Sequence, residues 1–315
     1  MILTRVETAT WLRHKDHFLI LSHRRPDGDT LGSTAALCLG LRQLGKTAHI
    51  LENPEITELY RHLHRGLTKP KAQKGDVIIS VDVASPGMLG ESARALQDRI
   101  ALRIDHHCTA TSFTPDELVD GEAGACGEII YDILRLLGVK LDKALAEALY
   151  TAVSTDTGCF RYANTTAHSF AVAAACAEAG GDLHTINQNV FDTNSLERLK
   201  IQSWIIQNLR LYKDGQMAVC ALPLAVEQDI GVNEDDMENI SGFPRSIKGV
   251  KIAATLRETV DGKVKISVRA LPGYDASQVC ARFGGGGHKG AAGANTDLPL
   301  EAAADAVTEA MEELF

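Results

Sequence analysis

The sequence contains 315 residues, of which 45% are hydrophobic and 23% are charged, so it is long enough to form two globular domains. Its formal net charge of −9 argues against long duplex nucleic acid as a partner, because proteins that track a duplex usually present a broad basic face. No stretch approaches the roughly 20 apolar residues that span a bilayer, and the start of the chain lacks the apolar run of a signal peptide, so we expect a cytoplasmic protein with no membrane partner.

Short runs rich in β-branched residues alternate with helical patterns in the first half of the chain. This alternation is typical of a parallel sheet covered by helices on both faces. We therefore predict an α/β fold with a parallel sheet in the N-terminal domain. Strands are expected at residues 18–22, 47–51, 77–82 and 100–105, and helices at 32–44, 127–137 and 141–153.

The pattern changes after residues 195–211, whose helical periodicity predicts a long connecting helix. We predict an N-terminal domain at 1–190, a linker helix at 191–213 and a smaller α/β domain at 214–315. In the smaller domain, strands are expected at 217–222, 250–257 and 263–269, with Asp261-Gly262 as a hairpin turn, and helices at 275–283 and 300–314.

The seven cysteines are scattered along the chain, and no two of them form a CxxC pair. This spacing favours reduced thiols over a zinc site or a disulfide framework. The residues concerned are Cys38, Cys108, Cys126, Cys159, Cys176, Cys220 and Cys280.

Acidic and histidine residues follow three of the predicted strands. His23 begins the motif HRRPDGD after the first strand, while Asp82 and Asp105 end two later strands. Ligands of open α/β sheets bind outside the carboxyl ends of the strands. We therefore expect these residues to converge on one site, together with Asp156, which lies in a Thr-Asp-Thr segment where a further element ends.

This residue composition predicts a metal site. Clustered carboxylates repel one another and are pushed towards protonation unless a divalent cation neutralises them. Mixed Asp and His ligands without thiolate suit Mn²⁺ or a similar ion, whereas oxygen ligands alone would favour Mg²⁺. Four aspartates and two histidines suffice for two ions if one aspartate bridges. Two ions roughly 3.5–4 Å apart form the arrangement used for in-line displacement at phosphorus.

Each residue also has an ordinary structural interpretation. The segment Asp27-Gly28-Asp29 is compatible with a turn, and Asp82 with the cap of a helix that begins near Pro86. Asp156 is compatible with a cap or turn, and the pair His106-His107 with the protein surface. Their joint occurrence in this order, at the ends of predicted elements, favours the metal site.

A glycine run in the C-terminal half predicts a phosphate-binding loop. Gly284–Gly287 are consecutive glycines, which allow backbone amides to approach a phosphate closely, and a flexible linker is the alternative. Residues 245–290 hold nine Lys or Arg against three Asp or Glu, so a phosphate-binding strip and a solvated surface are both open interpretations. Arg269 ends a predicted strand and can hold a phosphate, whereas Arg257 is expected to be an exposed, solvated arginine.

These motifs resemble the DHH phosphoesterase family, and the resemblance spans essentially the whole chain. It is nearest to the bacterial oligoribonucleases of the nanoRNase class, which also act as pAp phosphatases. The motifs are HRRPDGD at 23–29, VD at 81–82, DHH at 105–107, TDTGCFRY at 155–162 and GGGGHKGAAG at 284–293, the last resembling the DHH-associated C-terminal domain.

The resemblance implies a role for each motif residue. One metal ion would be held by His23, Asp27 and Asp82. A second would be held by Asp29, Asp82, His106 and Asp156, with Asp82 as the bridge. Asp105 would orient a histidine, and His107 would face the scissile phosphate, stabilise charge there or protonate the leaving oxygen.

Substrate contacts are implied in the C-terminal domain, at Arg269, Gly285, Gly286, Gly287 and His288. The family often has serine after the arginine, but Ala270 stands there in this chain, so the local hydrogen bonding is expected to differ.

The resemblance also implies the activity. We expect a manganese-dependent phosphoesterase, often dimeric in this family, in which two metal ions activate a hydroxide. It would hydrolyse short oligoribonucleotides to mononucleotides and 3'-phosphoadenosine 5'-phosphate (pAp) to AMP. A phosphodiesterase for cyclic or linear dinucleotides and a non-catalytic nucleotide-binding sensor are the alternatives. The GGGGH motif disfavours a manganese pyrophosphatase, and the chain has no room for the extra domains of a processive exonuclease.

Overall fold

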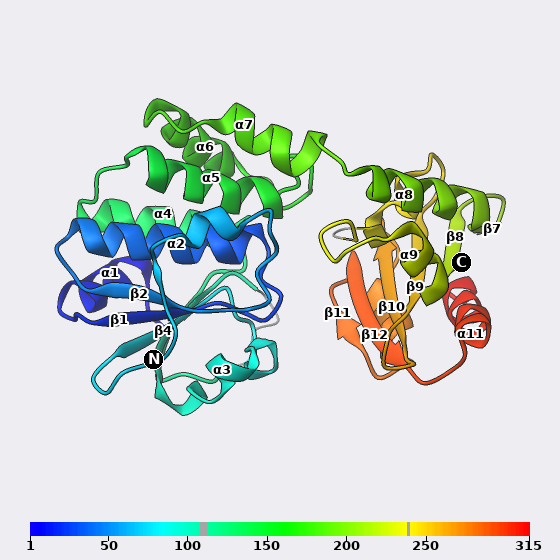
Figure 1. Ribbon diagram of the computed structural model, residues 1–315, viewed down its shortest axis with the longest axis horizontal. Coiled ribbons are helices and arrows are strands. Elements are labelled where there is room, and N and C mark those ends of the chain that lie inside the picture. The colour runs from blue at the N-terminus through cyan, green and yellow to red at the C-terminus, as the bar shows by residue number, and fades with distance from the viewer. Residues whose placement is uncertain (108–111, 238–239) are drawn as a thin grey trace. The chain divides into compact units, whose positions relative to one another are not determined.

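The computed structural model describes residues 1–107, 112–237 and 240–315, and the chain folds into two compact units (Figure 1). The first unit comprises Met1–Thr193 and the second Asn194–Phe315. Each unit combines helices with a six-stranded sheet, so the predicted α/β class is confirmed. None of the helices among the described residues has the length and apolar character needed to cross a membrane.

The first unit is built on a parallel sheet. Its strands are β1 (Phe18–Leu21), β2 (Ala48–Leu51), β3 (Thr68–Lys69), β4 (Val77–Val81), β5 (Ile100–Asp105) and β6 (Asp116–Val119). They are ordered β3-β2-β1-β4-β5-β6, and all neighbouring pairs are parallel. β1 is apolar throughout because it is buried on both faces. Phe18 and Ile20 belong to one core cluster, and Leu19 and Leu21 to another.

Helices cover both faces of this sheet. They are α1 (Arg5–Arg13), α2 (Gly28–Gln43), α3 (Glu91–Arg94), α4 (Cys126–Leu137), α5 (Lys143–Asp156), α6 (Ala167–Glu178) and α7 (Leu183–Asn187). Figure 1 shows α2, α4 and α5 stacked on one side of the sheet and α3 on the other. Short 3₁₀ or π turns occupy Arg61–His64, Pro86–Met88, Gln97–Arg99 and Gln188–Asp192.

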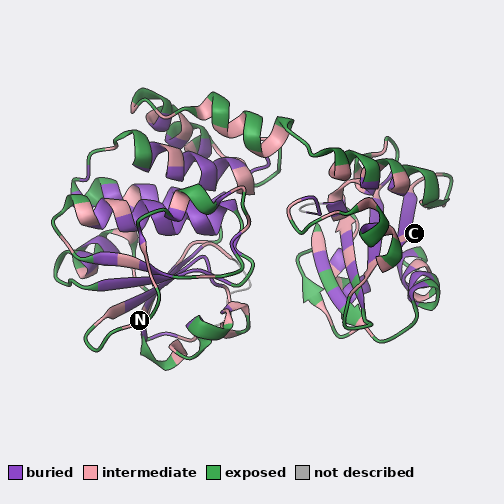
Figure 2. Cartoon of the chain, viewed as in Figure 1, coloured by how far each residue is buried: buried purple, intermediate pink, exposed green. Residues whose placement is uncertain are grey.

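Helix α2 is buried along most of its length (Figure 2). Gly32 allows this close packing, since a Cβ atom there would lie 2.3 Å from the backbone oxygen of Ala148 in α5. Asp27 caps the helix by accepting a hydrogen bond from the Thr30 amide at 3.0 Å. The helix therefore begins at Gly28, earlier than predicted, and the turn interpretation of the Asp-Gly-Asp segment is wrong.

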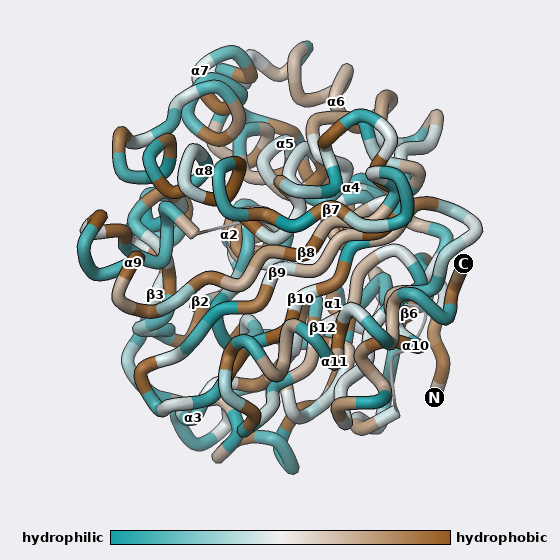
Figure 3. Tube along the Cα trace, turned by 90° about the vertical axis from the view of Figure 1, so that its right-hand side faces the viewer, coloured by the Kyte–Doolittle hydropathy of each residue, from teal (hydrophilic) through white to brown (hydrophobic). Residues whose placement is uncertain are grey.

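The second unit is built on a mixed sheet. Its strands are β7 (Arg210–Tyr212), β8 (Met217–Leu222), β9 (Ile252–Glu258), β10 (Val264–Ala270), β11 (Gly286–Gly287) and β12 (Ala291–Thr296). They are ordered β11-β12-β10-β9-β8-β7; β8 and β9 are parallel, and the other pairs are antiparallel. Figure 3 shows hydrophobic residues along β8 and β9, which contribute Met217, Val219 and Ile252 to the core.

The helices of the second unit are α8 (Leu196–Asn208), α9 (Leu224–Ile230), α10 (Ala276–Ala281) and α11 (Leu300–Glu312), with 3₁₀ turns at Ile240–Gly242 and Pro244–Ser246. Ile201 and Ile205 of α8 are buried in a cluster with Cys220 of β8. The helix predicted at 195–211 ends at Asn208, because the residues that follow pair with β8 as the edge strand β7.

Arg257 near the end of β9 is not the solvated arginine that we predicted. Its Nε and Nη2 atoms donate to the two carboxylate oxygens of Glu227 in α9, at 2.7 and 2.8 Å. The side chain is 17% exposed, so this pairing ties α9 to the sheet. Its role is therefore structural.

Six of the seven cysteines lie among the described residues, and all six are free thiols, as predicted. Cys108 lies outside the described residues. Five of the six are buried and Cys159 is partly exposed.

Candidate metal centre

The predicted metal ligands gather at the point in the first sheet where the order of the strands reverses. From β1 the chain continues to β2 and β3 on one side, whereas β4 lies on the other side of β1. Such a switch point opens a crevice outside the carboxyl ends of the two strands. His23 follows β1, Asp82 follows β4, and His106 and His107 follow β5 at this edge.

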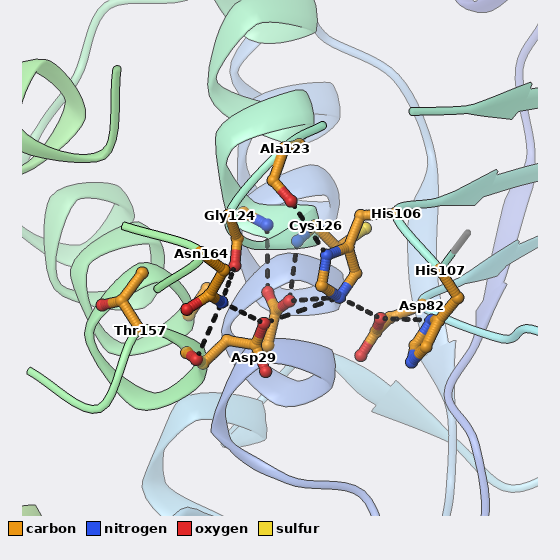
Figure 4. Close-up of polar contacts among 12 residues, drawn as sticks. Asp29, Asp82, His106, His107, Ala123, Gly124, Cys126, Thr157 and Asn164 are labelled. Atoms are coloured by element: carbon orange, nitrogen blue, oxygen red, sulfur yellow. Dashed lines mark hydrogen bonds and ion pairs between the residues drawn. The ribbon is translucent and has the colours of Figure 1, made fainter. Parts of the chain in front are cut away.

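Asp82 lies at the centre of the cluster (Figure 4). Its Oδ2 is 3.9 Å from His23 Nε2, and its Oδ1 is 3.6 Å from His106 Nε2. Oδ2 accepts a hydrogen bond from Thr30 Oγ1 at 2.5 Å, but among the described residues the buried Oδ1 has no hydrogen-bond partner. Asp82 also has a left-handed φ of +59°, which is strained for an aspartate. Ser85, not Asp82, precedes the short turn at Pro86, so the capping interpretation is wrong.

The surrounding residues form three overlapping groups of possible ligands, and Asp82 belongs to two of them. Within each group, the ligand atoms lie within 4.8 Å of one another. The bridging position predicted for Asp82 is compatible with this geometry. Two of the groups hold the six predicted ligands: His23, Asp27 and Asp82, and Asp29, His106 and Asp156. The third joins Asp82 and His106 to His107.

Backbone carbonyls orient two of the histidines. His23 Nδ1 lies 2.6 Å from the oxygen of Arg24, and His106 Nδ1 lies 3.2 Å from the oxygen of Ala123. A carbonyl only accepts hydrogen bonds, so we assign the proton of each neutral ring to Nδ1. The lone pair of each Nε2 then points towards the carboxylates, as in a metal ligand.

Asp29 comes from the first turn of α2 and is only 1% exposed. Its Oδ2 accepts from the amide of Cys126 at 2.7 Å, and its Oδ1 accepts from the amide of Gly127 at 2.9 Å and from Ser33 Oγ at 2.8 Å. The first turn of α4 therefore holds this carboxylate through backbone groups.

Asp156 is the last residue of α5, and a side chain from a later loop fixes it. The amide of Asn164 donates to the backbone oxygen of Asp156 at 3.1 Å and to its Oδ2 at 3.4 Å. It also donates to the oxygen of Gly124 at 2.8 Å (Figure 4). Sequence reasoning missed Asn164 and Thr30, because a single amide or hydroxyl carries no recognisable spacing.

His107 belongs to a chain of polar contacts that leads into the core. Its Nδ1 lies 2.7 Å from Asp105 Oδ1, so Asp105 orients this ring. The other oxygen of Asp105 lies 3.8 Å from Nη1 of Arg103, which is only 1% exposed and donates to Glu117 at 3.0 Å. Burial alone would lower the pKa of His107, but the hydrogen bond with Asp105 raises it. His107 is therefore suited to carry a proton into the site.

Two family models match this chain: the DHH family, N-terminal domain, at residues 17–153, and the DHHA1 domain at residues 214–315. A Thermus thermophilus protein named bifunctional oligoribonuclease and PAP phosphatase NrnA is 31% identical over 298 residues, which cover 93% of this chain and 89% of that protein. The chain belongs to the DHH family. A Streptococcus mutans protein named probable bifunctional oligoribonuclease and PAP phosphatase NrnA is 26% identical to this DHH-family chain, over 89% of it and 90% of the relative.

Solved structures share the fold of this chain. An exopolyphosphatase-related protein from Bacteroides fragilis superposes with a TM-score of 0.89 at 25% identity, over 98% of this chain and 96% of that one. The exonuclease RecJ bound to manganese has a TM-score of 0.51 at 16% identity, over 99% of this chain and 94% of that one. The likeness to RecJ shows a shared fold alone.

The pKa values of the clustered side chains are shifted towards their protonated forms. Burial and then the neighbouring carboxylates raise the pKa values of Asp29 and Asp82. Burial likewise raises the pKa of Asp156 to about 7. Burial would lower the pKa of His106, but Asp29, Asp82 and Asp156 together raise it to about 9. A bound cation would take the place of these protons, so the donor set fits divalent metal ions.

We expect metal binding at this centre to release protons. Because the carboxylates have raised pKa values and His106 must lose its proton to become a ligand, cations compete with protons. Titration calorimetry of Mn²⁺ into metal-free protein should show release of at least about one proton per chain near pH 7, measured in buffers of different ionisation enthalpy. The affinity should fall as the pH is lowered from about 8 to about 6. Proton-neutral, pH-independent binding would contradict this assignment.

The predicted substrate residues lie in the second unit. Arg269, near the end of β10, donates from Nη1 to the oxygen of Val268 at 3.1 Å. The exposed His288 lies in the turn between β11 and β12, where its amide donates to the oxygen of Ala291 at 2.8 Å.

The glycine run is neither a simple loop nor a flexible linker. Gly286 and Gly287 pair with β12 as the edge strand β11. A Cβ atom at Gly285 would lie 2.2 Å from the backbone oxygen of Gly293, so this close approach of two chains requires glycine. Strand packing therefore explains part of the run, and its phosphate contacts remain a prediction.

Proposed function

We propose that this chain is a two-metal phosphoesterase that hydrolyses short oligoribonucleotides to mononucleotides and pAp to AMP, with Mn²⁺ as the preferred ion. The names of the relatives from Thermus thermophilus and Streptococcus mutans support the substrates. The position of Asp82 gives the main support for the two-metal mechanism. This residue lies between two ligand groups, and one of its buried oxygens has no hydrogen bond among the described residues.

The proposed ligand sets follow the two groups. His23, Asp27 and Asp82 would hold one ion, and Asp29, Asp82, His106 and Asp156 the other. Mixed imidazole and carboxylate ligands without thiolate suit Mn²⁺. When bound, a pair of divalent cations supplies a hydroxide nucleophile near neutral pH and neutralises charge on the phosphoryl oxygens.

The leaving oxygen needs a proton, and we assign its transfer to His107. Asp105 holds the ring by its Nδ1, which leaves Nε2 to face the substrate. The raised pKa of His107 means that the ring carries a proton near neutral pH more readily than an ordinary histidine does. Asp105 thus acts through His107 and not on the substrate.

Residues 1–190 would carry out the chemistry, and residues 214–315 would bind the substrate. Arg269, Gly285, Gly286, Gly287 and His288 are the proposed contacts. Part of the basic segment at 245–290 is engaged within the fold, since Arg257 pairs with Glu227 and Arg282 with Glu313.

We expect Arg269→Ala to raise the KM for a diribonucleotide by roughly 10- to 100-fold, because a charge-assisted hydrogen bond contributes about 1.5–3 kcal/mol. Steady-state kinetics with Mn²⁺ measures the effect, and Arg269→Lys should recover part of it. Arg282→Ala, which removes an exposed cation of the same unit, is the matched control and should leave the KM unchanged. Equal losses in both variants would show that general charge, not Arg269 itself, attracts the substrate.

The activity is tested with one panel of substrates, each assayed with Mn²⁺ and with Mg²⁺: diribonucleotides, pAp, cyclic di-AMP, polyphosphate, pyrophosphate and a long RNA. We expect the highest kcat/KM for diribonucleotides and pAp with Mn²⁺. Faster cleavage of the cyclic dinucleotide would favour the dinucleotide phosphodiesterase, and binding without turnover would favour the sensor. The expected homodimer and cytoplasmic location stay predictions.

A further inference from the structure

The loop after Asp156 has an unusual backbone that the metal centre does not explain. Gly158, Cys159 and Phe160 have φ values of +57°, +56° and +60°, so three consecutive residues are left-handed. Only glycine adopts this conformation readily, and strained residues persist where the surrounding structure fixes them, often at functional sites. This loop is the second half of the motif TDTGCFRY, whose first half supplies Asp156.

Hydrogen bonds to nearby backbone oxygens hold the loop in place. The amide of Cys159 donates to the oxygen of Ser154 at 2.6 Å, and the amide of Tyr162 donates to the oxygen of Thr157 at 3.0 Å. Nε of Arg161 donates to the oxygen of Gly158 at 2.6 Å. The residues at the tip of the loop are therefore presented in one fixed arrangement.

The loop presents the ring of Tyr162, a residue that is 55% exposed. A Cβ atom on Gly158 would lie 2.3–2.6 Å from three carbons of this ring, so the ring rests on the glycine backbone. Within the described part of the chain, the side chain of Tyr162 makes no hydrogen bond and no ring contact. A flat aromatic surface is thus supported from below and open to solvent.

The backbone of Tyr162 is tied to the segment of the proposed ligand Asp156, because its amide donates to Thr157, the next residue. Gly158, which supports its ring, is two residues after Asp156, and Asn164, two residues after Tyr162, donates to both the backbone and the carboxylate of Asp156. Figure 4 shows Thr157 and Asn164 on the side of the cluster away from His107. The loop that carries Tyr162 is thus joined to the cluster through Thr157 and Asn164, on the side away from the proposed proton donor.

We propose that Tyr162 is a stacking platform for the nucleobase of the substrate, an assignment that rests on the proposed function. Every base has a flat face that stacks on an aromatic ring, so such a platform binds nucleotides with little preference for sequence. This property suits an enzyme that degrades oligoribonucleotides of any composition.

A neighbouring exposed aromatic residue provides the control. Phe170 in α6 is 57% exposed, but its ring stacks on Phe160 at 5.1 Å, and Phe160 packs near Tyr150. Phe170 is therefore engaged with the protein itself, although its exposure matches that of Tyr162.

The kinetic test compares pAp with ribose 3',5'-bisphosphate, which has the same phosphates but no base. Tyr162→Ala should raise the KM for pAp about tenfold, as expected for one lost base stack, with kcat changed much less. The KM for the abasic compound should show no comparable rise, and Tyr162→Phe should restore binding of pAp. Phe170→Ala should behave as the wild type. A similar loss for both compounds would overturn the platform, because it would indicate damage to Asp156.

Binding provides a second readout that does not depend on turnover. Stacking quenches the fluorescence of 2-aminopurine, so its riboside 5'-monophosphate should be quenched by the wild type and by Tyr162→Phe but not by Tyr162→Ala. Equal quenching by Tyr162→Ala would also overturn the platform. If the wild type hydrolyses no nucleotide at all, the proposed function fails, while the quenching experiment still decides whether Tyr162 stacks on a base.

Discussion

The Asp82→Asn substitution is expected to lower kcat by roughly a thousandfold or more for every nucleotide substrate. Asp82 contacts both ligand groups, so losing its charge weakens both proposed ions at once. Metal ions contribute several kcal/mol to stabilising charge in the transition state, and each 1.4 kcal/mol or so is a factor of ten in rate. Steady-state rates measured with saturating Mn²⁺ check this prediction, and retention of more than about a tenth of the activity would contradict it.

Unfolding can be separated from this loss of activity. Asparagine tolerates the left-handed φ of +59° at this position and can still accept the hydrogen bond from Thr30. The pKa of Asp82 is raised by burial, so its charge destabilises the metal-free fold at pH values above the pKa that it has in the unfolded chain. Asp82→Asn should therefore raise the Tm of the metal-free protein near pH 7, whereas Mn²⁺ should raise the Tm of the wild type far more than that of the variant.

Replacing His107 with alanine should lower kcat for oligoribonucleotides by about 10²- to 10⁴-fold, the usual contribution of a general acid. Asp105 holds Nδ1 of this ring at 2.7 Å and raises its pKa, which favours the protonated donor. The loss should be much smaller for a p-nitrophenyl phosphate ester, because that leaving group departs without a proton. Kinetics on the two substrates gives the comparison.

Calorimetry is the control for His107→Ala. Mn²⁺ should bind to the variant as it does to the wild type, since Nδ1 of His107 is engaged with Asp105 and the proposed ligand sets do not include this residue. An equal loss on both substrates, or a loss of metal affinity, would assign His107 to holding the site together.

Much of the site follows from local sequence, because half of the proposed ligands follow strand ends and the others lie at helix ends. The apolar runs of β1, β4 and β5 predict buried parallel strands, and His23, Asp82 and Asp105 stand at or just after their carboxyl ends. The resemblance to the DHH family added the prediction of which of these residues act as ligands. The structure brings the six predicted ligands together in two groups.

The partners of these ligands were not predictable from the sequence. Asn164 reaches Asp156 from a loop, and the amides of Cys126 and Gly127 reach Asp29 across almost a hundred residues of sequence. Such contacts depend on how helices pack, and a backbone amide leaves no signature in the sequence. Thr30 is likewise an ordinary helical residue until the fold places it beside Asp82.

The incorrect predictions about the fold also arise from contacts between residues that are distant in the sequence. β7 is a three-residue edge strand, too short for an alternating pattern, and only its pairing with β8 defines it. Arg257 was expected in solvent because Glu227, its partner, lies thirty residues earlier in the chain. The glycines at 284–287 suggested a loop, but two of them form an edge strand whose closeness to β12 excludes side chains.

Six side chains from distant parts of the chain are proposed to bind a pair of cations needed for catalysis. The most direct test is a titration of Mn²⁺ into chelator-treated protein, with bound metal and hydrolysis of a diribonucleotide measured on the same samples. We predict no activity without metal, and activity that rises to its maximum as two ions bind per chain. Full activity after exhaustive chelation, or saturation at a single ion, would contradict the account.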